Sequence, residues 1–388
     1  MRADHRLQTS APVQVRTFRG MAEPLKTQFG AAIPRRLADD IARAFPDFPR
    51  DPFLRDALRG FDELELLDRG RHLGRALQAH LPRDFPTAVD ILLATLPTER
   101  SSEGGMASFY YLPHTEFVRA FGLGHFDDAM RALHALTQHF TAEFAIRLFL
   151  EHHQGATLER MHEWTRDASE HVRRLVSEGS RPRLPWAPRL RAFQKDPTPV
   201  LTLLERLRDD PSLYVRCSVA NNLNDIGKDH PKTLVETAAR WLADASPDRQ
   251  WVVQHALRSA VKRGDPAALK ALGYGMASTL EVTAHAITPK RPAIGGKVVV
   301  ECTLHNASRR LQRVIVDLIV HFVKANGSTS PKVFKLAVVD VAAGEEVSVR
   351  KTITLAQLST RTHYAGKHRV ELQMNGAAHV LGAFTLTA

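Results

Sequence analysis

The sequence predicts a multidomain protein in which an all-α solenoid of HEAT-like helical repeats is followed by a C-terminal all-β immunoglobulin-like sandwich. Two observations support this prediction. Apolar residues recur at helical spacing from about residue 35 to residue 272, whereas after residue 275 they occur in short alternating or β-branched runs. In addition, a motif in the helical part recurs after 43 residues, which lies within the period of HEAT repeats.

Composition divides the chain into three segments. Residues 1–20 are polar, basic and aperiodic, and they are predicted to form a flexible tail. Residues 21–275 are predicted to form the helical-repeat domain, and residues 278–388 the immunoglobulin-like domain. The boundary is placed where the helical pattern ends at Gly273, Tyr274 and Gly275.

The recurring motif suggests how a repeat begins. The segment DASEHVRR at 167–174 recurs as DPSLYVRC at 210–217, and a degenerate third copy begins near residue 245. Asp is expected to begin a tight turn and to cap the helix, Ser to open the helix, and Val172 and Val215 to face the stack. Arg173 and Arg216 would either reach a neighbouring turn or carry charge along the concave surface that stacked repeats form.

The C-terminal segment contains about seven short strand-like runs separated by turn signals such as Asn326-Gly327 and Asn375-Gly376. Six of these runs are clear in the sequence: 280–286, 298–305, 313–323, 333–339, 347–354 and 368–374. This number of strands is typical of an immunoglobulin or fibronectin sandwich. Cys302 lacks a partner at the usual second position, so no disulfide between the sheets is expected.

The formal net charge of +11 and the isoelectric point near 9.9 favour a polyanionic partner. Residues 276–388 hold 14 Lys and Arg against 7 Asp and Glu, a net charge of +7. Within the helical part, residues 173–195 hold seven cations and a single acid, Glu178. Such a basic run is either a solvated face or a binding surface.

Several functional classes are not supported. No apolar stretch approaches the roughly 18 residues needed to cross a bilayer, so no membrane partner is expected. The 19 histidines show no metal-ligand spacing, and no Gly-rich phosphate loop or nucleophile elbow is present. The site is therefore predicted to contain no metal and no cofactor.

Three segments resemble the AlkC family of HEAT-like DNA glycosylases. They are EFAIRLFL at 143–150, HVRRLVSEGSRPRLPWAPRL at 171–190 and DDPSLYVRCSVANNLNDIGKDHP at 209–231. With the closing segment WVVQHALRSAVKRG at 251–264, the resemblance covers most of residues 30–273. Some members carry an additional immunoglobulin-like domain, as this chain would. The sequence reads NNLND and RLFL where the family pattern has NHLND and RPFL, but neither change removes an acid or a Trp.

The resemblance implies that Glu143, Glu178 and Asp225 are the carboxylates of the active site, with Trp186 beside them. Glu178 is also the isolated acid in the basic run. Each residue has a local alternative. Glu143 would be a capping-box acid after Thr141, and Glu178 the partner of a nearby arginine. Asp225 would be an exposed helix acid or a partner for Lys228, and Trp186 a packing anchor between prolines.

The implied activity is a base-excision-repair hydrolysis of the N-glycosidic bond of cationic N-alkylated bases, such as 3-methyladenine and 3-methylcytosine, without deep base flipping. Carboxylates near the sugar would stabilise an oxocarbenium-like transition state and orient water. Trp186 would contact the cationic base through its ring face. No residue is identified as a proton donor to the departing base.

The expected partner is double-stranded DNA with alkylated bases, bound by a monomer at the nucleoid in the bacterial cytoplasm. The alternatives are a non-catalytic DNA-binding repeat protein and a scaffold for a protein partner. Phosphates are expected to contact cations of both domains, namely Arg173, Arg174, Arg181, Arg183, Arg189, Arg191, Arg216 and Lys228 in the helical part and Lys290, Arg291, Arg309 and Arg310 in the sandwich.

Overall fold

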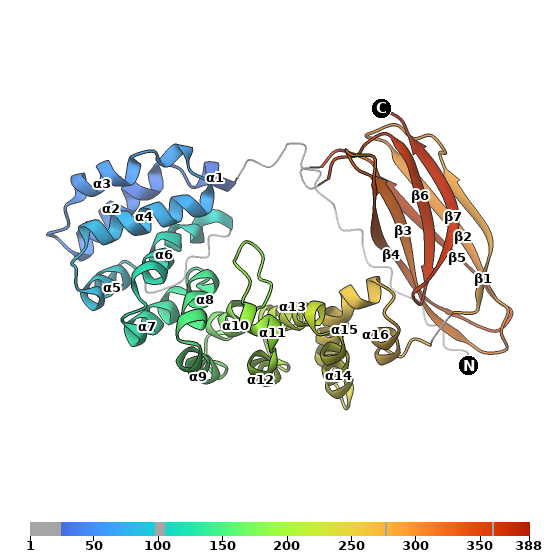
Figure 1. Cartoon of the computed structure of the whole chain (residues 1–388), viewed down its shortest axis with the longest axis horizontal. Coiled ribbons are helices and arrows are strands. Elements are labelled where there is room, and N and C mark those ends of the chain that lie inside the picture. Colours follow the sequence, from blue (N-terminus) through green and yellow to red (C-terminus); the bar gives the residue numbers. More distant parts are fainter. Residues whose placement is uncertain (1–24, 98–104, 276–277, 359–360) are drawn as a thin grey trace, which may run out of the picture.

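The computed structural model describes residues 25–97, 105–275, 278–358 and 361–388. An arc of helices is followed by a sandwich of two β-sheets, and a hollow lies between the arc and the sandwich (Figure 1). The predicted fold class is therefore confirmed. The predicted flexible tail, residues 1–20, lies outside the described residues. Within the described residues no helix is both long and apolar enough to span a membrane.

The arc consists of short helices that alternate between two layers. The helices are α1 (Leu25–Gln28), α2 (Ala32–Ala44), α3 (Arg50–Leu58), α4 (Leu66–His80), α5 (Phe85–Ala94), α6 (Leu112–Phe121), α7 (Phe126–Leu136), α8 (Glu143–His152), α9 (Gln154–Trp164), α10 (Glu170–Gly179), α11 (Arg191–Lys195), α12 (Thr198–Leu207), α13 (Leu213–Asp229), α14 (Pro231–Leu242), α15 (Pro247–Lys262) and α16 (Pro266–Ala271), with 3₁₀ turns η1 (Phe61–Glu63) and η2 (Gly105–Tyr111).

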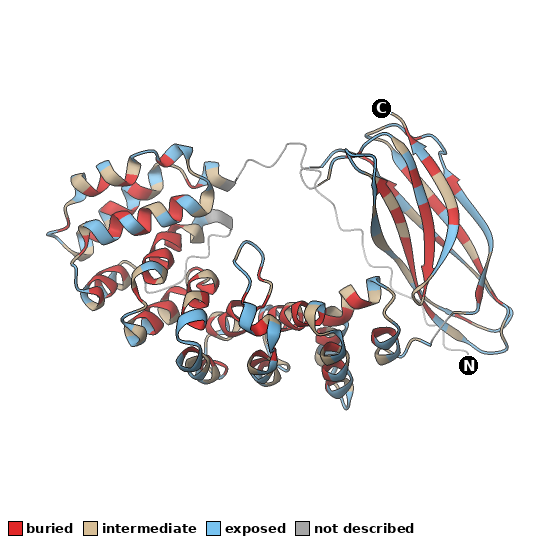
Figure 2. Cartoon of the chain, in the orientation of Figure 1, coloured by how far each residue is buried: buried red, intermediate tan, exposed pale blue. Residues whose placement is uncertain are grey.

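Helices α4, α6, α8, α10, α13 and α15 contact one another in succession and form the inner layer, which faces the hollow (Figure 1). Helices α7, α9, α12 and α14 lie on the outer side. One continuous apolar core fills the space between the layers, and Figure 2 shows buried residues along the facing sides of the helices. The inner layer therefore presents a row of helices to whatever occupies the hollow.

The recurring motif begins helices α10 and α13, as predicted, but its Asp does not cap them. The Asp167 carboxylate accepts a hydrogen bond from the Ser169 amide at 2.8 Å, and Asp210 accepts one from Ser212 at 2.9 Å. Each Asp thus closes the turn before the helix, while Ser169 occupies the capping position without a side-chain cap. Val172 and Val215 are fully buried in the stack, as predicted.

The two arginines of the motif connect neighbouring repeats. Arg173 forms a bidentate pair with Asp210 at 2.6 and 3.0 Å and also donates to two backbone carbonyls. Arg216 repeats this arrangement one repeat later, with an ion pair to Asp248 at 3.2 Å. Of the two alternatives, reaching a neighbouring turn is the one found. Because these guanidinium groups are both paired and largely buried, Arg173 and Arg216 are poorly placed to contact a phosphate.

The C-terminal domain is a seven-stranded antiparallel sandwich with its own apolar core. One sheet has the strand order β1-β2-β5 and the other β4-β3-β6-β7. Both cysteines of the chain are unpaired. The strands are β1 (Leu280–Thr288), β2 (Lys297–Asn306), β3 (Gln312–Val323), β4 (Thr329–Val341), β5 (Glu346–Thr354), β6 (Gly366–Met374) and β7 (Ala377–Leu386), the last of which follows the Asn375-Gly376 turn.

Two glycines form the contact between the arc and the sandwich. Gly264 follows α15 with φ of 72°, and Gly376 lies in the β6–β7 turn with φ of 88°. A Cβ atom on Gly264 would lie 2.7 Å from the Gly376 Cα, and one on Gly376 would lie 2.6 Å from the Gly264 oxygen. Both positions therefore require glycine, because of the left-handed backbone and because the two backbones touch.

A buried acid lies beside this contact. Asp317 of β3 is 4% exposed, and its charged neighbours are Lys335 of β4 and Lys262 of α15. Burial raises the pKa of Asp317 to about 6, although the two lysines act in the opposite direction. The unfolded chain loses this proton first, so the free energy of unfolding falls as the pH rises from about 4 to about 6.

Replacing Asp317 by Asn is expected to stabilise the protein above pH 6 by about 1–3 kcal/mol, because the variant has no carboxylate to desolvate. Thermal unfolding of both proteins between pH 3.5 and 8 measures this difference, which should vanish below about pH 4. Asp340→Asn, an exposed acid of the same sheet, serves as the control and should change little. A stability difference that is independent of pH would contradict the prediction.

Candidate active site

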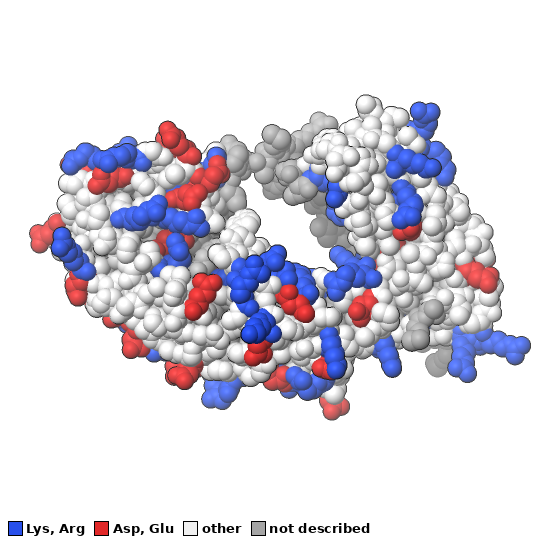
Figure 3. Space-filling model, in the orientation of Figure 1, with Lys and Arg blue, Asp and Glu red and all other residues white. Residues whose placement is uncertain are grey.

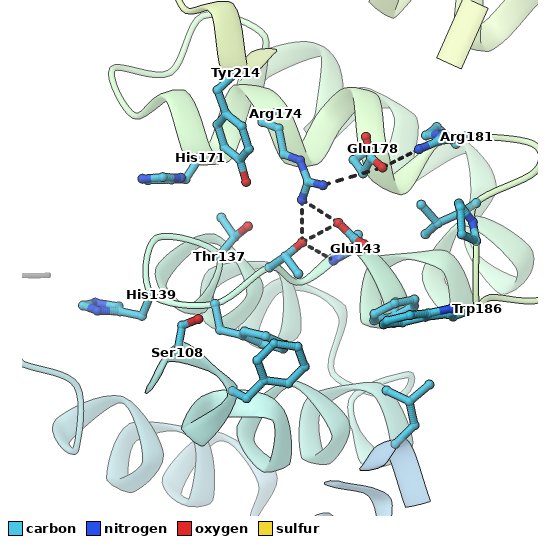
Figure 4. A pocket seen from close by; sticks show the side chains of 17 residues that line it. Ser108, Thr137, His139, Glu143, His171, Arg174, Glu178, Arg181, Trp186 and Tyr214 are labelled. Carbon is cyan, nitrogen blue, oxygen red and sulfur yellow. Dashed lines mark hydrogen bonds and ion pairs between the residues drawn. The ribbon is translucent and has the colours of Figure 1, made fainter. Parts of the chain in front are cut away.

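A cavity of about 410 Å³ opens on the inner side of α8 and α10. Glu143 reaches it from the first turn of α8, Glu178 from the last turn of α10, and Trp186 from the loop that follows α10. Figure 4 shows the two carboxylates and Arg174 lying between Trp186 on one side and Tyr214 on the other. Three of the four predicted site residues therefore line one cavity.

The carboxylates alternate with cations in a continuous chain. Arg174 donates to Glu143 and lies 3.6 Å from Glu178. Arg181 then joins Glu178, at 2.6 Å, to Asp225, at 2.7 Å. The other oxygen of Asp225 is paired with Lys228 at 2.7 Å, which closes the chain. The three negative and three positive groups of this series therefore compensate one another.

The pKa values of Arg174 and Arg181 follow from this alternating series of charges. Burial lowers the pKa of Arg174, but the neighbouring Glu143 and Glu178 carboxylates outweigh it, and the net pKa is raised. The same balance, with Glu178 and Asp225, raises the pKa of Arg181. Both guanidinium groups are therefore fixed positive charges at neutral pH. Sequence reasoning assigned them to phosphates, whereas the structure places them between the carboxylates.

Glu143 differs from the other two acids in how its oxygens are used. Thr141 and Arg174 both donate to Oε2 of Glu143, whereas Oε1 receives no hydrogen bond from the residues that the structure describes. Both oxygens of Glu178 are engaged, Oε1 by Arg181 and Oε2 by Ser218 at 2.6 Å. Glu143 thus retains an acceptor oxygen in the cavity. The capping-box alternative holds in part, because Thr141 does contact the first turn of α8.

Asp225 lies behind the cavity. It is 1% exposed, and it is not among the residues that line the cavity. Its Oδ2 accepts a hydrogen bond from Nε of Arg181 and lies 2.7 Å from Nη2 of the same residue, and its Oδ1 accepts a hydrogen bond from Lys228. The alternative that Asp225 is an exposed helix acid is wrong, although its predicted pairing with Lys228 is found. Asp225 can reach the cavity chemistry only through Arg181.

Trp186 is presented to solvent. Among the large apolar residues in the described part of the chain, Trp186 is the most exposed, at 69%. Its φ of 64° lies in the left-handed region, which is uncommon for a residue with a Cβ atom. Strain of this kind persists only where the surrounding structure imposes it. The alternative that Trp186 anchors the loop by packing is therefore wrong, since the ring is not buried.

Two cavity residues were missed by sequence reasoning. Tyr214 and His171 line the same cavity, and their rings form an edge-to-face pair at 5.7 Å. The Arg174 guanidinium lies 5.2 Å from the Tyr214 ring centre. The repeat alignment could have identified both, because His171 and Tyr214 occupy the same position in the DASEHVRR and DPSLYVRC copies.

Lys and Arg side chains gather along the middle of the arc, at the rim of the hollow (Figure 3). Arg183 is paired there with Asp229. Arg189 is exposed, and Arg191 is exposed with a 3.3 Å hydrogen bond to Gln194. Together with Lys228, these arginines have side chains that reach solvent close to the cavity, and they stay predicted phosphate contacts.

The four predicted DNA-binding cations of the sandwich do not form one surface. Lys290 and Arg291 precede β2, whereas Arg309 and Arg310 follow it. The ten residues of β2 separate the two pairs by about 30 Å. Sequence proximity to one strand therefore grouped residues that lie at opposite ends of the domain.

Within the described part of the chain, no cluster of three or more His, Cys, Asp or Glu side chains is arranged to hold a metal ion. The histidines nearest the site have other contacts: His171 packs against Tyr214, and His139 against Tyr111. A reaction without a metal or a cofactor stays a prediction.

Comparisons with known proteins agree with this architecture. A family model described as the C-terminal Ig-like domain of the uncharacterised protein YhaZ matches residues 281–388. The uncharacterised protein YhaZ of Bacillus subtilis is 37% identical over 354 residues, which span 91% of this chain and 96% of YhaZ. The alkylpurine DNA glycosylase AlkC of Pseudomonas fluorescens, solved with DNA containing an abasic site analog, is 36% identical with a TM-score of 0.87, covering 94% of this chain and 99% of that one. This chain therefore belongs to the AlkC family, in the version that carries a C-terminal immunoglobulin-like domain.

Proposed function

We propose that this protein is a DNA glycosylase that hydrolyses the N-glycosidic bond of cationic N-alkylated bases, such as 3-methyladenine and 3-methylcytosine, in double-stranded DNA. The observation that carries the proposal is the cavity in which Glu143, Glu178 and Trp186 meet, on the inner face of an arc whose cations gather along the rim of the hollow. Similarity along nearly the whole chain to a glycosylase solved with abasic DNA supports it.

The chemistry follows from what each side chain offers. Cleavage of the glycosidic bond places positive charge on the deoxyribose, and carboxylates close to the sugar stabilise that charge. Glu143, with Oε1 open, orients the attacking water and accepts its proton. Glu178 contributes fixed negative charge, and Asp225 holds Arg181 in place. The exposed ring of Trp186 contacts the cationic base, without a deep pocket for a flipped nucleotide.

The leaving group explains the proposed selectivity. A base alkylated on a ring nitrogen is already cationic and leaves without protonation, whereas a neutral base such as hypoxanthine requires a proton donor. The carboxyl groups at the cavity are paired with arginines, and the two histidines that line it, His139 and His171, are packed on Tyr111 and Tyr214. We therefore assign no general acid to this site, and a general acid ordinarily contributes about 10²–10⁴-fold in rate.

The purified protein should release 3-methyladenine and 3-methylcytosine from duplexes that hold one lesion each, and it should release hypoxanthine at the rate of the reaction without enzyme. Base release and cleavage of the resulting abasic site both report the reaction. Hypoxanthine released as fast as the cationic bases would mean that the site contains a proton donor and that the selectivity is wrong.

The same assay separates the two other functions. A non-catalytic DNA-binding protein would bind every duplex and release no base. A protein scaffold would neither release a base nor bind DNA, and its inner face would be apolar or acidic. The cations along the rim of the hollow favour the DNA-binding functions over the scaffold (Figure 3).

A further inference from the structure

A buried arginine lies beneath the loop that carries Trp186. Arg147 of α8 is 4% exposed and donates to three backbone carbonyls. The acceptors are Gly179 at 3.1 Å, Arg181 at 2.7 Å and Pro188 at 2.5 Å. None of these partners is acidic, so the guanidinium is used to hold backbone rather than to form an ion pair.

The three carbonyls belong to the segments that supply the site. Gly179 ends α10 and directly follows Glu178, Arg181 lies on the outgoing arm of the loop, and Pro188 lies on its returning arm. Arg147 itself is one helical turn after Glu143 on α8. One side chain therefore joins the backbone elements that carry Glu143, Glu178 and Trp186.

The loop needs such a connection because its tip is not held by packing. Trp186 is 69% exposed, and a second cavity of about 110 Å³ lies against its ring and against Arg147. Two backbone hydrogen bonds lie within the loop, from the Leu190 amide to the Pro182 oxygen at 3.2 Å and from the Ala187 amide to the Leu184 oxygen at 3.4 Å. The second bond closes a turn whose third residue is the left-handed Trp186. These bonds shape the loop, but they do not fix it to α8 or to the end of α10.

The carbonyl at the end of α10 also requires a partner. The last carbonyls of a helix receive no hydrogen bond from an amide of the same helix. Burying such a carbonyl without a donor costs about 1–3 kcal/mol. Ser180 donates to the Val176 oxygen and Asn222 to the Ser177 oxygen, while Arg147 donates to the Gly179 oxygen. Arg147 thus completes the hydrogen bonding of the helix end that carries Glu178. Burial lowers the pKa of Arg147 to about 10, which leaves it charged at neutral pH.

We propose that Arg147 is a positioning residue for the glycosylase reaction, and that its guanidinium sets the distance of Trp186 from Glu143 and Glu178. This inference rests on the proposed function. Arg147 does not touch substrate in this arrangement, so it acts on the rate of the chemical step through the geometry of the site. Misplacing reacting groups by about 1 Å can cost about 10²-fold in rate.

Arg147→Met should lower the single-turnover rate constant for 3-methyladenine release by about 10²-fold. The enzyme concentration for half-maximal rate should change by about twofold or less, because the phosphate contacts are intact. Arg147→Lys keeps the charge but cannot span three carbonyls, so it should give an intermediate rate. It also provides the measurement if the Met variant does not fold.

Arg69 offers a matched control, because it is also a buried arginine that donates only to backbone carbonyls, those of Lys26, Phe29, Asp62 and Leu64. Arg69→Met should lower the melting temperature and leave the single-turnover rate constant unchanged at a temperature where both variants are folded. If Arg147→Met slows release no more than Arg69→Met does, Arg147 is a structural residue only and the proposal is wrong.

A second readout does not depend on activity. In protein labelled with 5-fluorotryptophan, the four Trp residues give fluorine NMR signals, and Trp186→Phe identifies that of Trp186. Arg147→Met should shift or broaden the Trp186 signal and leave those of Trp241 and Trp251 in place. An unchanged Trp186 signal would overturn the positioning role. If the wild-type protein releases no base from any duplex, the proposed function fails, whereas this measurement still decides whether Arg147 holds the loop.

Discussion

Glu143→Gln is expected to slow 3-methyladenine release by about 10²–10³-fold, the usual effect of removing one electrostatic contact to a transition state. The amide cannot accept the proton of the attacking water, and it no longer places negative charge beside the sugar. Glu178→Gln should have an effect of similar size through the loss of charge alone. Affinity for undamaged DNA should be unchanged or higher in both variants, because a negative charge near the phosphates is removed.

Single-turnover base release and fluorescence anisotropy measure the two quantities separately. Glu170→Gln is the matched control, since Glu170 is an exposed acid at the start of the same helix as Glu178 and should retain full activity. Because Glu143 and Glu178 both contact Arg174, circular dichroism melts are needed to show that each variant is folded. An amide variant with wild-type activity would remove that residue from the catalytic assignment.

Deleting residues 278–388 is expected to weaken DNA binding and to flatten its dependence on salt. The deleted residues carry a net charge of +7. Each phosphate contact contributes about −0.9 to the slope of log K against log salt, so losing contacts reduces the slope. The arc and the sandwich have separate apolar cores, so the helical part retains its own core after the deletion. Titrations of an undamaged duplex between 50 and 300 mM salt, roughly the range over which such contacts are measured, give the slope.

The two cationic pairs of the sandwich permit a sharper test. Lys290 and Arg291 lie about 30 Å from Arg309 and Arg310, at the other end of β2. Neutralising the pair that contacts DNA should reduce the slope by about 2, while neutralising the other pair should leave it unchanged. An unchanged slope after the complete deletion would mean that the sandwich serves stability or another partner.

The fold class and the membership of Glu143, Glu178 and Trp186 in one cavity could be predicted from the sequence. Periodicity changes sharply near residue 275, and the segments around these three residues carry the family resemblance. The role of the arginines could not be predicted. Arg174 and Arg181 look like the other cations of the basic run, and only the packing of α10 on α8 and α13 places them between carboxylates.

Asp225 and Arg147 are two further residues whose roles could not be predicted from the sequence. The resemblance implied that Asp225 is an active-site carboxylate like Glu178, but its buried carboxylate lies behind Arg181. The contacts of Arg147 could not be predicted, because its hydrogen-bond acceptors are carbonyls more than thirty residues away, at 179, 181 and 188. Every residue has a backbone carbonyl, so no residue type in the sequence indicates which carbonyls act as acceptors. A side chain that holds a loop through such carbonyls is identified only once the path of the loop is known.

The contact between Gly264 of the arc and Gly376 of the sandwich has a consequence for how damaged DNA would bind. Gly264 and Gly376 touch through their backbones, and the side-chain amide of Gln373 lies beside them. Because the two backbones already touch, these turns cannot move closer together, so a duplex bound by both domains would itself have to bend to fit. DNA differs in how easily it bends, with pyrimidine–purine steps the softest and A-tracts the stiffest. Under the proposed function, release of the same lesion would therefore depend on how easily its flanking sequence bends.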